Sequence, residues 1–305
     1  MEPQPFVERS LRLTSGADAL ATIRSLWQGP MDPQMRVERG GTVMRAMRLA
    51  SGSATLRLNV SRAEIVARAW GAGADEALDL VPALVGDLDQ PPRDMPFAHR
   101  LVADLFRRLP GLRLTSGTPV IEALVPSIIG QKVTSFEARR SHRTLLVAHG
   151  ERAPSPYGLM LPPPPAKLAQ LPYWAFHPLG LERRRADTIR AAAAVAPRLE
   201  KTRALAPTEA LRTLQSVPGI GPWTAAETVR LALGDPDAVS IGDYHLPALV
   251  CFALTGSREG GDERMLELLE PYRGQRARVV LLIEHSGLRP ERRGPRYAPR
   301  SIAAI

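Results

Sequence analysis

Two different spacings of hydrophobic residues divide the chain near residue 90. Before that point, apolar and polar residues alternate with the period expected of half-buried strands. The alternating runs are Met35–Glu38, Thr42–Leu49 and Ala54–Val60, with the glycine-containing turns Gly40-Gly41 and Ser51-Gly52-Ser53 between them. After that point, apolar residues recur three and four positions apart, which predicts α-helices. The pattern therefore indicates a mixed α/β unit followed by a helical body.

Three helices are predicted inside the α/β unit. The first covers Ser15–Trp27 and the last covers Asp75–Leu88. Ser61 and Glu64 have the spacing of a capping box, so we expect a further helix from Ser61 to Trp70.

The prolines of Gln90–Pro96 mark the boundary with the helical body. Gly150–Pro165 is polar and rich in proline, and we interpret it as a spacer between helices rather than as a ligand for a proline-binding module. The helices predicted beyond the boundary are Phe97–Leu109, Val120–Gly130, Thr134–His149, Lys167–Leu171, Leu181–Lys201 and Thr208–Val217.

The stretch VPGIGPWTAAETVRLALGDPDAVSIGD, from Val217 to Asp243, is the most informative. Pro218 and Gly219 end one helix, Gly221 permits a tight turn, and Pro222 suits the first position of the next helix. Such a turn leaves unpaired backbone N–H groups at the second helix's N-terminus, where they can bind a phosphate. The pattern indicates a helix-hairpin-helix that contacts nucleic-acid backbone, although an ordinary pair of packed helices could use the same residues.

Composition favours an anionic partner. The net charge is +9 and the pI is about 10.5, which fits nucleic acid. The single cysteine, Cys251, excludes a disulfide framework and a four-cysteine iron–sulfur cluster, and the histidines lack the spacing of a zinc site. No apolar run is long enough to span a membrane and the N-terminus does not resemble a signal peptide. We therefore expect a cytoplasmic protein, associated with the nucleoid if it is bacterial.

The hairpin, followed by the SIGDY run at Ser240–Tyr244, resembles the helix-hairpin-helix (HhH-GPD) DNA glycosylases, in particular the 3-methyladenine DNA glycosylase II (AlkA-type) branch. Ser127–Thr134 (SIIGQKVT) and Arg183–Ala192 (RRRADTIRAA) resemble other helices of that family, so the resemblance covers roughly residues 30–290. It implies a mainly α protein with an α+β N-terminal domain, in which two helical subdomains flank the active-site cleft.

The resemblance also suggests how the chain divides. Residues 1–92 would form the N-terminal domain with a small antiparallel sheet. Residues 93–115 and 227–290 would form the helical domain with the catalytic aspartate, and residues 116–226 the helical domain that ends in the hairpin. Residues 291–305 would be a basic, proline-rich tail, either contacting phosphates or simply solvated.

Asp243 matches the position of the family's catalytic aspartate. Cleavage of an N-glycosidic bond builds positive charge on the sugar, and a fixed carboxylate beside C1′ can stabilise that charge and activate water. The alternative is that Asp243 only caps the helix that starts near Tyr244. Asp235 and Asp237 are nearby rivals, but their D-P-D string indicates a turn.

Trp223 occupies the position where the bifunctional members carry a lysine that attacks C1′. Tryptophan cannot form a Schiff base, so the resemblance implies a monofunctional glycosylase without AP lyase activity. The indole is also expected to stack on the extruded base, and a core role is compatible with that.

The flipped nucleotide must leave a gap that the protein fills. The resemblance assigns this role to Lys132, after Gly130-Gln131, and places Gln131 at the rim of the base pocket, although Gln131 could equally be a surface amide. Phosphate contacts are expected from the backbone N–H groups of Gly219, Gly221 and Thr224 and from Lys132, Arg276 and Arg278. The carbonyls of Val217 and Ile220 could hold a Na⁺ or K⁺ ion, and no other cofactor is expected.

Two pocket positions depart from the AlkA-type pattern. Glu227 replaces a tyrosine and Glu284 replaces a tryptophan, so aromatic surface that suits a cationic base gives way to carboxylates. Trp174, beside Tyr173 and Phe176, could supply a substitute wall, but an ordinary core role is favoured for that group.

Together these features predict a monomeric enzyme, without membrane association, that flips alkylated purines such as 3-methyladenine out of double-stranded DNA and excises them in base excision repair. Two alternatives stay open. One is a glycosylase with shifted specificity for deaminated or bulkier bases, and the other is a non-catalytic DNA-binding protein that has kept the hairpin.

Overall fold

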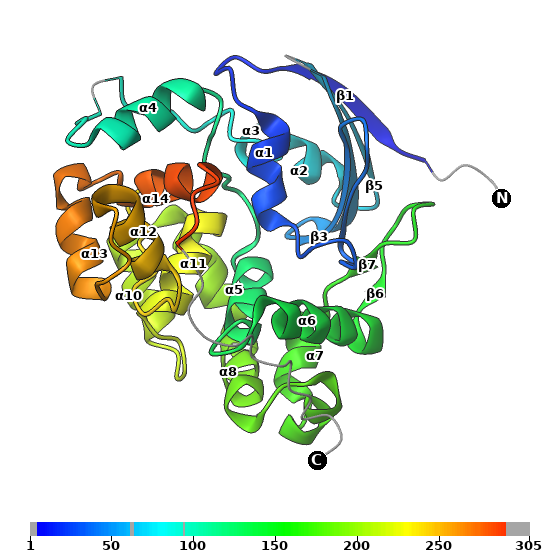
Figure 1. The fold of residues 1–305 in the computed structure, drawn as a ribbon. Helices are drawn as coiled ribbons and strands as arrows, with labels where there is room; N and C mark the ends of the chain where they lie inside the picture. The colour runs from blue at the N-terminus through cyan, green and yellow to red at the C-terminus, as the bar shows by residue number, and fades with distance from the viewer. Residues whose placement is uncertain (1–4, 62–63, 94, 291–305) are drawn as a thin grey trace.

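The computed structural model describes residues 5–61, 64–93 and 95–290, and the predicted basic tail lies outside these residues. A five-stranded antiparallel sheet in the order β1-β5-β4-β3-β2 forms the N-terminal part (Figure 1). Its strands are β1 (Val7–Arg12), β2 (Met35–Val37), β3 (Thr42–Leu49), β4 (Gly52–Val60) and β5 (Glu64–Trp70). The three strands predicted by alternation are confirmed as β2, β3 and β4, and β1 is an additional edge strand.

The helix predicted over Ser61–Trp70 is wrong, because this segment is mostly strand β5. Ile65, Ala67 and Ala69 alternate with less buried residues and are themselves fully buried against the core. The backbone N–H and the hydroxyl of Ser61 both donate to the Glu64 carbonyl at 2.9 Å, which closes the turn between β4 and β5. The Ser-x-x-Glu spacing therefore belongs to a hairpin turn here, not to a helix cap.

Short helical segments pack their apolar side chains on the sheet. They include α1 (Ala19–Ile23) and the 3-10 turn η1 (Arg24–Leu26). The helix predicted over Asp75–Leu88 is divided into α2 (Ala74–Asp79) and α3 (Val81–Leu84), which meet at Leu80. These elements and the inner face of the sheet make one hydrophobic core.

The helical body follows the predicted pattern closely. One division was not predicted: the helix expected over Leu181–Lys201 breaks at Val195. Pro197 lies in the first turn of the next helix, because a proline could not have continued the first one. The body contains α4 (Arg100–Arg108), α5 (Val120–Ile129), α6 (Ser135–His149), α7 (Pro165–Gln170), η2 (Tyr173–Ala175), η3 (His177–Leu179), α8 (Arg183–Ala194), α9 (Ala196–Glu200), η4 (Lys201–Ala204), α10 (Pro207–Gln215), α11 (Pro222–Ala232), α12 (Leu246–Thr255), α13 (Asp262–Leu269), η5 (Glu270–Tyr272) and α14 (Arg276–His285).

The spacer at Gly150–Pro165 contains two short paired strands, β6 (Glu151–Arg152) and β7 (Met160–Leu161). Leu159 and Leu161 pack against buried side chains of β3, so this segment touches the N-terminal sheet. It is a structured connection, not only a linker.

The helices form two further hydrophobic cores. One is built from residues 120–238 and the other from residues 95–114 together with residues 239–283. The boundary expected between residues 226 and 227 falls inside α11, yet Ala226 and Val229 belong to the same core on both sides of it. All of α11 therefore packs with the hairpin half of the body.

A buried carboxylate joins the sheet to the helical body. Glu122 on α5 accepts hydrogen bonds from the side chain of Gln34 and the backbone N–H of Arg48, both at 2.7 Å. Its carboxylate also lies 3.2 Å from the buried guanidinium of Arg45. Burial raises the pKa of Glu122, because the carboxylate has lost its water.

Candidate active site

The hairpin connects α10 to α11 through a turn that requires one of its two glycines. Gly219 has a φ of 88°, and a Cβ placed there would meet the Thr188 hydroxyl at 2.0 Å. Gly221 instead has an extended φ of −93°, and a Cβ there would meet no other atom within 4 Å. Gly219 therefore forms the turn, whereas Gly221 leaves open space beside the first N–H groups of α11.

The start of α11 has the features of an anion site. Its N-cap, Gly221, makes no side-chain cap hydrogen bond, and Pro222 occupies the first turn as expected. The Thr224 side chain is buried and accepts a hydrogen bond from Gln131, so only its backbone can face a ligand. Val217 and Ile220 lie within the turn, where the Val217 carbonyl accepts the Ile220 N–H at 3.1 Å.

The side chain of Gln131 forms hydrogen bonds with the hairpin. Its side-chain amide donates to the Gly219 carbonyl at 3.0 Å and to the Thr224 hydroxyl at 2.8 Å. The next residue, Lys132, is exposed and has a φ of 55°, the only positive φ of a non-glycine residue in the described part of the chain. Gln131 and Lys132 thus form a tight loop directly beside the hairpin, after the end of α5.

Asp243 lies in the loop between α11 and α12 and is held by three donors. Its Oδ1 accepts the backbone N–H groups of His245 and Leu246 at 2.7 and 2.8 Å. Its Oδ2 accepts the indole Nε1–H of Trp223 at 2.9 Å. The carboxylate therefore caps α12, as the alternative interpretation expected, and is also fixed in orientation by a side chain of the hairpin helix.

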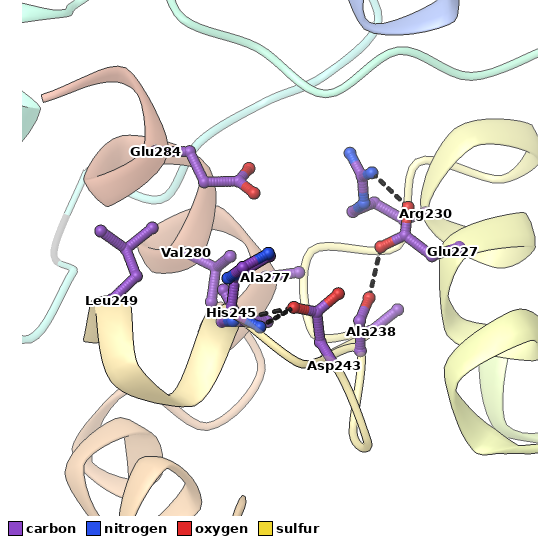
Figure 2. Close-up of a pocket in the computed structure, with 11 residues that line it drawn as sticks. Glu227, Arg230, Ala238, Asp243, His245, Leu249, Ala277, Val280 and Glu284 are labelled. Carbon is purple, nitrogen blue, oxygen red and sulfur yellow. Dashed lines mark hydrogen bonds and ion pairs between the residues drawn. The ribbon is translucent and has the colours of Figure 1, made fainter. Parts of the chain in front are cut away.

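The Asp243 carboxylate also faces a pocket with a volume of about 100 Å³ (Figure 2). One wall comes from α11, and the others come from the Asp243 loop, α12 and α14, so the pocket lies between the two helical cores. The lining residues are Glu227, Arg230, Ala238, Ser240, Asp243, His245, Leu246, Leu249, Ala277, Val280 and Glu284.

Both predicted glutamates line this pocket, but their surroundings differ. Glu227 is engaged on both oxygens: Oε2 accepts from Arg230 at 2.7 Å, and Oε1 accepts from the Ser240 hydroxyl. The Glu284 carboxyl points from α14 toward the space between Arg230 and Asp243 (Figure 2). The pKa of Glu284 is raised, because the surrounding protein removes part of its hydration and because the Glu227 and Asp243 carboxylates lie nearby, although Arg230 opposes this.

Other predicted site residues lie elsewhere. Trp174 on η2 is 65% exposed and packs edge-to-face on Tyr173, and it is not among the residues that line the pocket. Arg278 was predicted to contact a phosphate, and the structure corrects this. Its side chain is 4% exposed and forms two 2.7 Å bonds with Asp89, so Arg278 belongs to a buried ion pair. Arg276 is held by Asp237, which it contacts through Nε at 2.8 Å.

Arg230 and Ser240 are pocket residues that the sequence did not reveal. Arg230 is three residues after Glu227 on the same helix face, which is the spacing of an intrahelical ion pair and the one sequence signal for it. Ser240 comes into contact with Glu227 only through the fold. Among the described residues, no group of three or more His, Cys, Asp or Glu side chains is arranged to hold a metal ion. No helix in the same part of the chain is long and apolar enough to cross a membrane.

Comparisons with known proteins bear on this fold. No family model matches the chain. It is similar to DNA-3-methyladenine glycosylase 2 of Escherichia coli (strain K12), with 34% identity over 118 residues, which is 38% of this chain and 42% of that protein. The match thus spans less than half the length of the relative.

Solved structures extend the likeness to almost the whole chain. A 3-methyladenine DNA glycosylase from Archaeoglobus fulgidus superposes with a TM-score of 0.75 at 19% identity, over 91% of this chain and 97% of that one. An 8-oxoguanine glycosylase/lyase from Clostridium acetobutylicum, in complex with double-stranded DNA, gives a TM-score of 0.66 at 12% identity, over 93% and 99%. At these identities the likeness establishes the fold. The chain therefore has the fold of these DNA glycosylase structures, and part of it is similar in sequence to the E. coli enzyme.

Proposed function

We propose that the protein is a monofunctional DNA glycosylase that hydrolytically excises alkylated purines of the 3-methyladenine type. The observation that carries this proposal is the Asp243 carboxylate, which faces the pocket and is held by Trp223 of the hairpin helix. The hairpin would bind the DNA backbone while the pocket receives the damaged base. The names of similar proteins, two of them 3-methyladenine glycosylases, support the same substrate class.

Backbone N–H groups at Gly219, Gly221 and Thr224 would contact a phosphate, because the N-terminus of α11 has no side-chain cap and is open beside Gly221. The exposed Lys132, on the tight loop beside the hairpin, would fill the gap left by the flipped nucleotide with its methylenes. The carbonyls of Val217 and Ile220 suit a monovalent cation, which would add positive charge near the phosphate.

In the pocket, Asp243 would lie beside C1′ of the flipped nucleotide. As the C1′–N bond lengthens, positive charge grows on the sugar, and a carboxylate already fixed by three donors stabilises it without reorganising. The same carboxylate would take a proton from the attacking water. A base that already carries a positive charge leaves without further help.

Water would be the nucleophile, because Trp223 offers no amine at the position where the bifunctional relatives carry lysine. The expected product is therefore an abasic site in an intact strand. A monomer acting on duplex DNA suffices for this reaction, since Asp243, the pocket and the hairpin all come from one chain.

The test is release of free base from a duplex treated with a methylating agent, followed under single-turnover conditions for wild type and Asp243→Asn. We expect the wild type to release methylated purines and to leave the strand intact until alkali is added. Asn keeps one acceptor for the N–H groups that start α12 but lacks the charge, so we expect the rate to fall by about 10²–10³-fold.

DNA binding, measured in parallel by fluorescence anisotropy, should be retained in the variant. If neither form releases base while both bind the duplex, the protein is a non-catalytic DNA-binding member of the fold. Equal rates for the two forms would instead remove Asp243 from the chemistry.

A further inference from the structure

The pocket contains three carboxyl groups, and they differ in how they are bonded. Asp243 accepts three hydrogen bonds, and Glu227 is bonded on both oxygens to Arg230 and Ser240. Among the described residues, the side chain of Glu284 accepts no hydrogen bond and forms no ion pair at contact distance. Its carboxyl is thus the one in this pocket that is free to bond to whatever enters.

Glu284 also has the right placement to meet a base. It projects from α14 on one side of the pocket, with its carboxyl directed into the space that Arg230 and Asp243 border (Figure 2). A purine whose C1′ lies at Asp243 would extend its ring into this space. Glu284 would then meet the departing base, whereas Asp243 meets the sugar.

The wall of this pocket lacks the aromatic rings that would hold a cationic base by stacking. Its lining contains no Phe, Tyr or Trp side chain, and the polar members are Glu227, Arg230, Ser240, Asp243, His245 and Glu284. An uncharged purine is a poor leaving group, because its departure places negative charge on the ring unless a proton arrives. A pocket that handles such a base needs a proton donor on the side of the base.

We propose that Glu284, in its carboxylic acid form, is a general acid that protonates an uncharged purine as it leaves, so that the pocket accepts neutral damaged purines as well as cationic ones. This inference rests on the proposed glycosylase function and names a second catalytic residue for the same site. It assigns the two carboxyl groups opposite roles, Asp243 toward the sugar and Glu284 toward the base.

The step is balanced. The electron pair of the C1′–N9 bond passes into the purine, and the proton of Glu284 moves to a ring nitrogen of the base, leaving a carboxylate. The oxygen of water bonds to C1′, and its released proton goes to Asp243 and then through solvent back to Glu284. Nucleotide and water thus give a free base and an abasic site, with both carboxyl groups restored.

Burial favours the acid form of Glu284. Loss of hydration is the main cause of its raised pKa; among the nearby charges, Arg230 on α11 and His285 on α14 lower the pKa, whereas Glu227 on α11 and Asp243 on its loop raise it. A base that fills the pocket expels further water, which disfavours the carboxylate still more. Arg230 can donate a hydrogen bond but not a proton. The rival proton donor in the pocket is His245, whose ring lies 4.8 Å from that of Tyr244.

The experiment compares two duplexes, one with a single hypoxanthine and one carrying methylated, cationic purines. For Glu284→Gln, we expect hypoxanthine release to fall by about 10²-fold, because general acids contribute about 10²–10⁴-fold, while release of methylated purines stays within about threefold. Glu284→Asp, which keeps the acid, should recover part of the loss. Glu267→Gln, on the surface helix α13, is the matched control and should behave as wild type.

The pH profile separates proton donation from shaping of the pocket. Wild-type hypoxanthine release should fall as pH rises through the pKa of Glu284. This decline should disappear in Glu284→Gln and persist in His245→Gln. A decline that disappears in His245→Gln instead would make the histidine the acid and overturn the inference.

The remaining outcomes separate this inference from the proposed function. If Glu284→Gln slows both substrates equally, or neither, Glu284 is not a general acid. If the wild type releases methylated purines but no hypoxanthine, the inference fails and the proposed function stands. If the wild type releases no base from either duplex, both fail.

Discussion

At the scale of single residues, the site depends on the contact between Trp223 and Asp243. The indole donates to Oδ2 at 2.9 Å, and its ring also lies against the end of α5, where a Cβ on Gly130 would come within 3.4 Å of Cη2. Trp223 therefore sets the orientation of the carboxylate and links it to the loop of Gln131 and Lys132. This role is separate from any stacking on the base.

Trp223→Phe tests that separation, because phenylalanine keeps an aromatic face but has no N–H. A hydrogen bond to a charged group contributes about 1.5–3 kcal/mol, so we expect the single-turnover rate of base release to fall by about 10- to 100-fold. Duplex affinity should change little, since the hairpin backbone is untouched. An unchanged rate would mean that the two backbone N–H groups alone orient Asp243.

Three carboxyl residues that were predicted for the site lie together in the structure. The family resemblance assigned Asp243 to catalysis and Glu227 and Glu284 to the base pocket, and all three side chains line one pocket. Arg278 was predicted to contact a phosphate, because its partner Asp89 is far away in sequence and no local pattern links the two. A lone basic residue in a basic chain does not show whether its charge is already neutralised.

At the scale of elements, the junction between α6 and the sheet contains a buried imidazole. His142 on α6 is 3% exposed, lines a second pocket together with Gln34 and Glu122, and its Nδ1 lacks a hydrogen-bond partner among the described residues. Loss of hydration lowers the pKa of His142, the nearby Arg45 lowers it further, and Asp32 opposes this. The folded protein therefore disfavours the protonated form of this side chain.

The consequence is a dependence of stability on pH. Because the folded pKa lies below the unfolded value of 6.5, the unfolded chain gains a proton that the folded one does not, and stability is lost as pH falls below that value. We expect the free energy of unfolding to drop by up to about 1.4 kcal/mol per pH unit in this window. Denaturant melts of wild type and His142→Gln would measure this, and the variant should show the smaller slope.

His177→Gln is the matched control, since His177 lies on η3 and is not enclosed at this junction. It should keep the wild-type slope. Identical slopes for wild type and His142→Gln would show that His142 does not cause the acid sensitivity.

Elements were predicted well in the helical body where proline and glycine mark its boundaries, as at Gly221 and Pro222, but the boundary at Pro197 was missed. The error at Ser61–Trp70 has a clear physical source. Serine followed three residues later by glutamate suits a helix cap, but Ile65, Ala67 and Ala69 alternate and pair with β1 on one side and β4 on the other. The alternation of buried residues along β5, which has a period of two, therefore decides the structure of this segment rather than the four-residue Ser-x-x-Glu motif.

At the scale of the whole molecule, three hydrophobic cores are joined by buried polar contacts. Glu122 joins the sheet to α5, and Arg278 joins α14 to the segment that leaves the N-terminal domain, where Asp89 also accepts the backbone N–H of Leu114 at 2.9 Å. The pocket beside Asp243 lies between the two cores of the helical body. The amino-acid sequence did not reveal these buried polar contacts, because the two partners of each contact are far apart along the chain.

Arg278→Met removes one partner of the buried pair and leaves the Asp89 carboxylate uncompensated. Removing one member of such a pair costs about 3–5 kcal/mol, so we expect a large loss in the free energy of unfolding by chemical denaturation. The dependence of DNA affinity on salt should be unchanged, because a buried arginine releases no counterion from DNA. A flatter salt dependence with intact stability would restore Arg278 as a phosphate contact.

The double use of Asp243 has a practical consequence for trapping the protein on DNA. An alanine at this position would free two amides at the start of α12 as well as removing the charge, so the variant would differ from wild type in shape and not only in reactivity. Asparagine keeps an acceptor for those amides, and a complex caught with it should show the damaged nucleotide in an undistorted site. For the same reason, substitution of Asp243 would be poorly tolerated even in a descendant that does not excise bases.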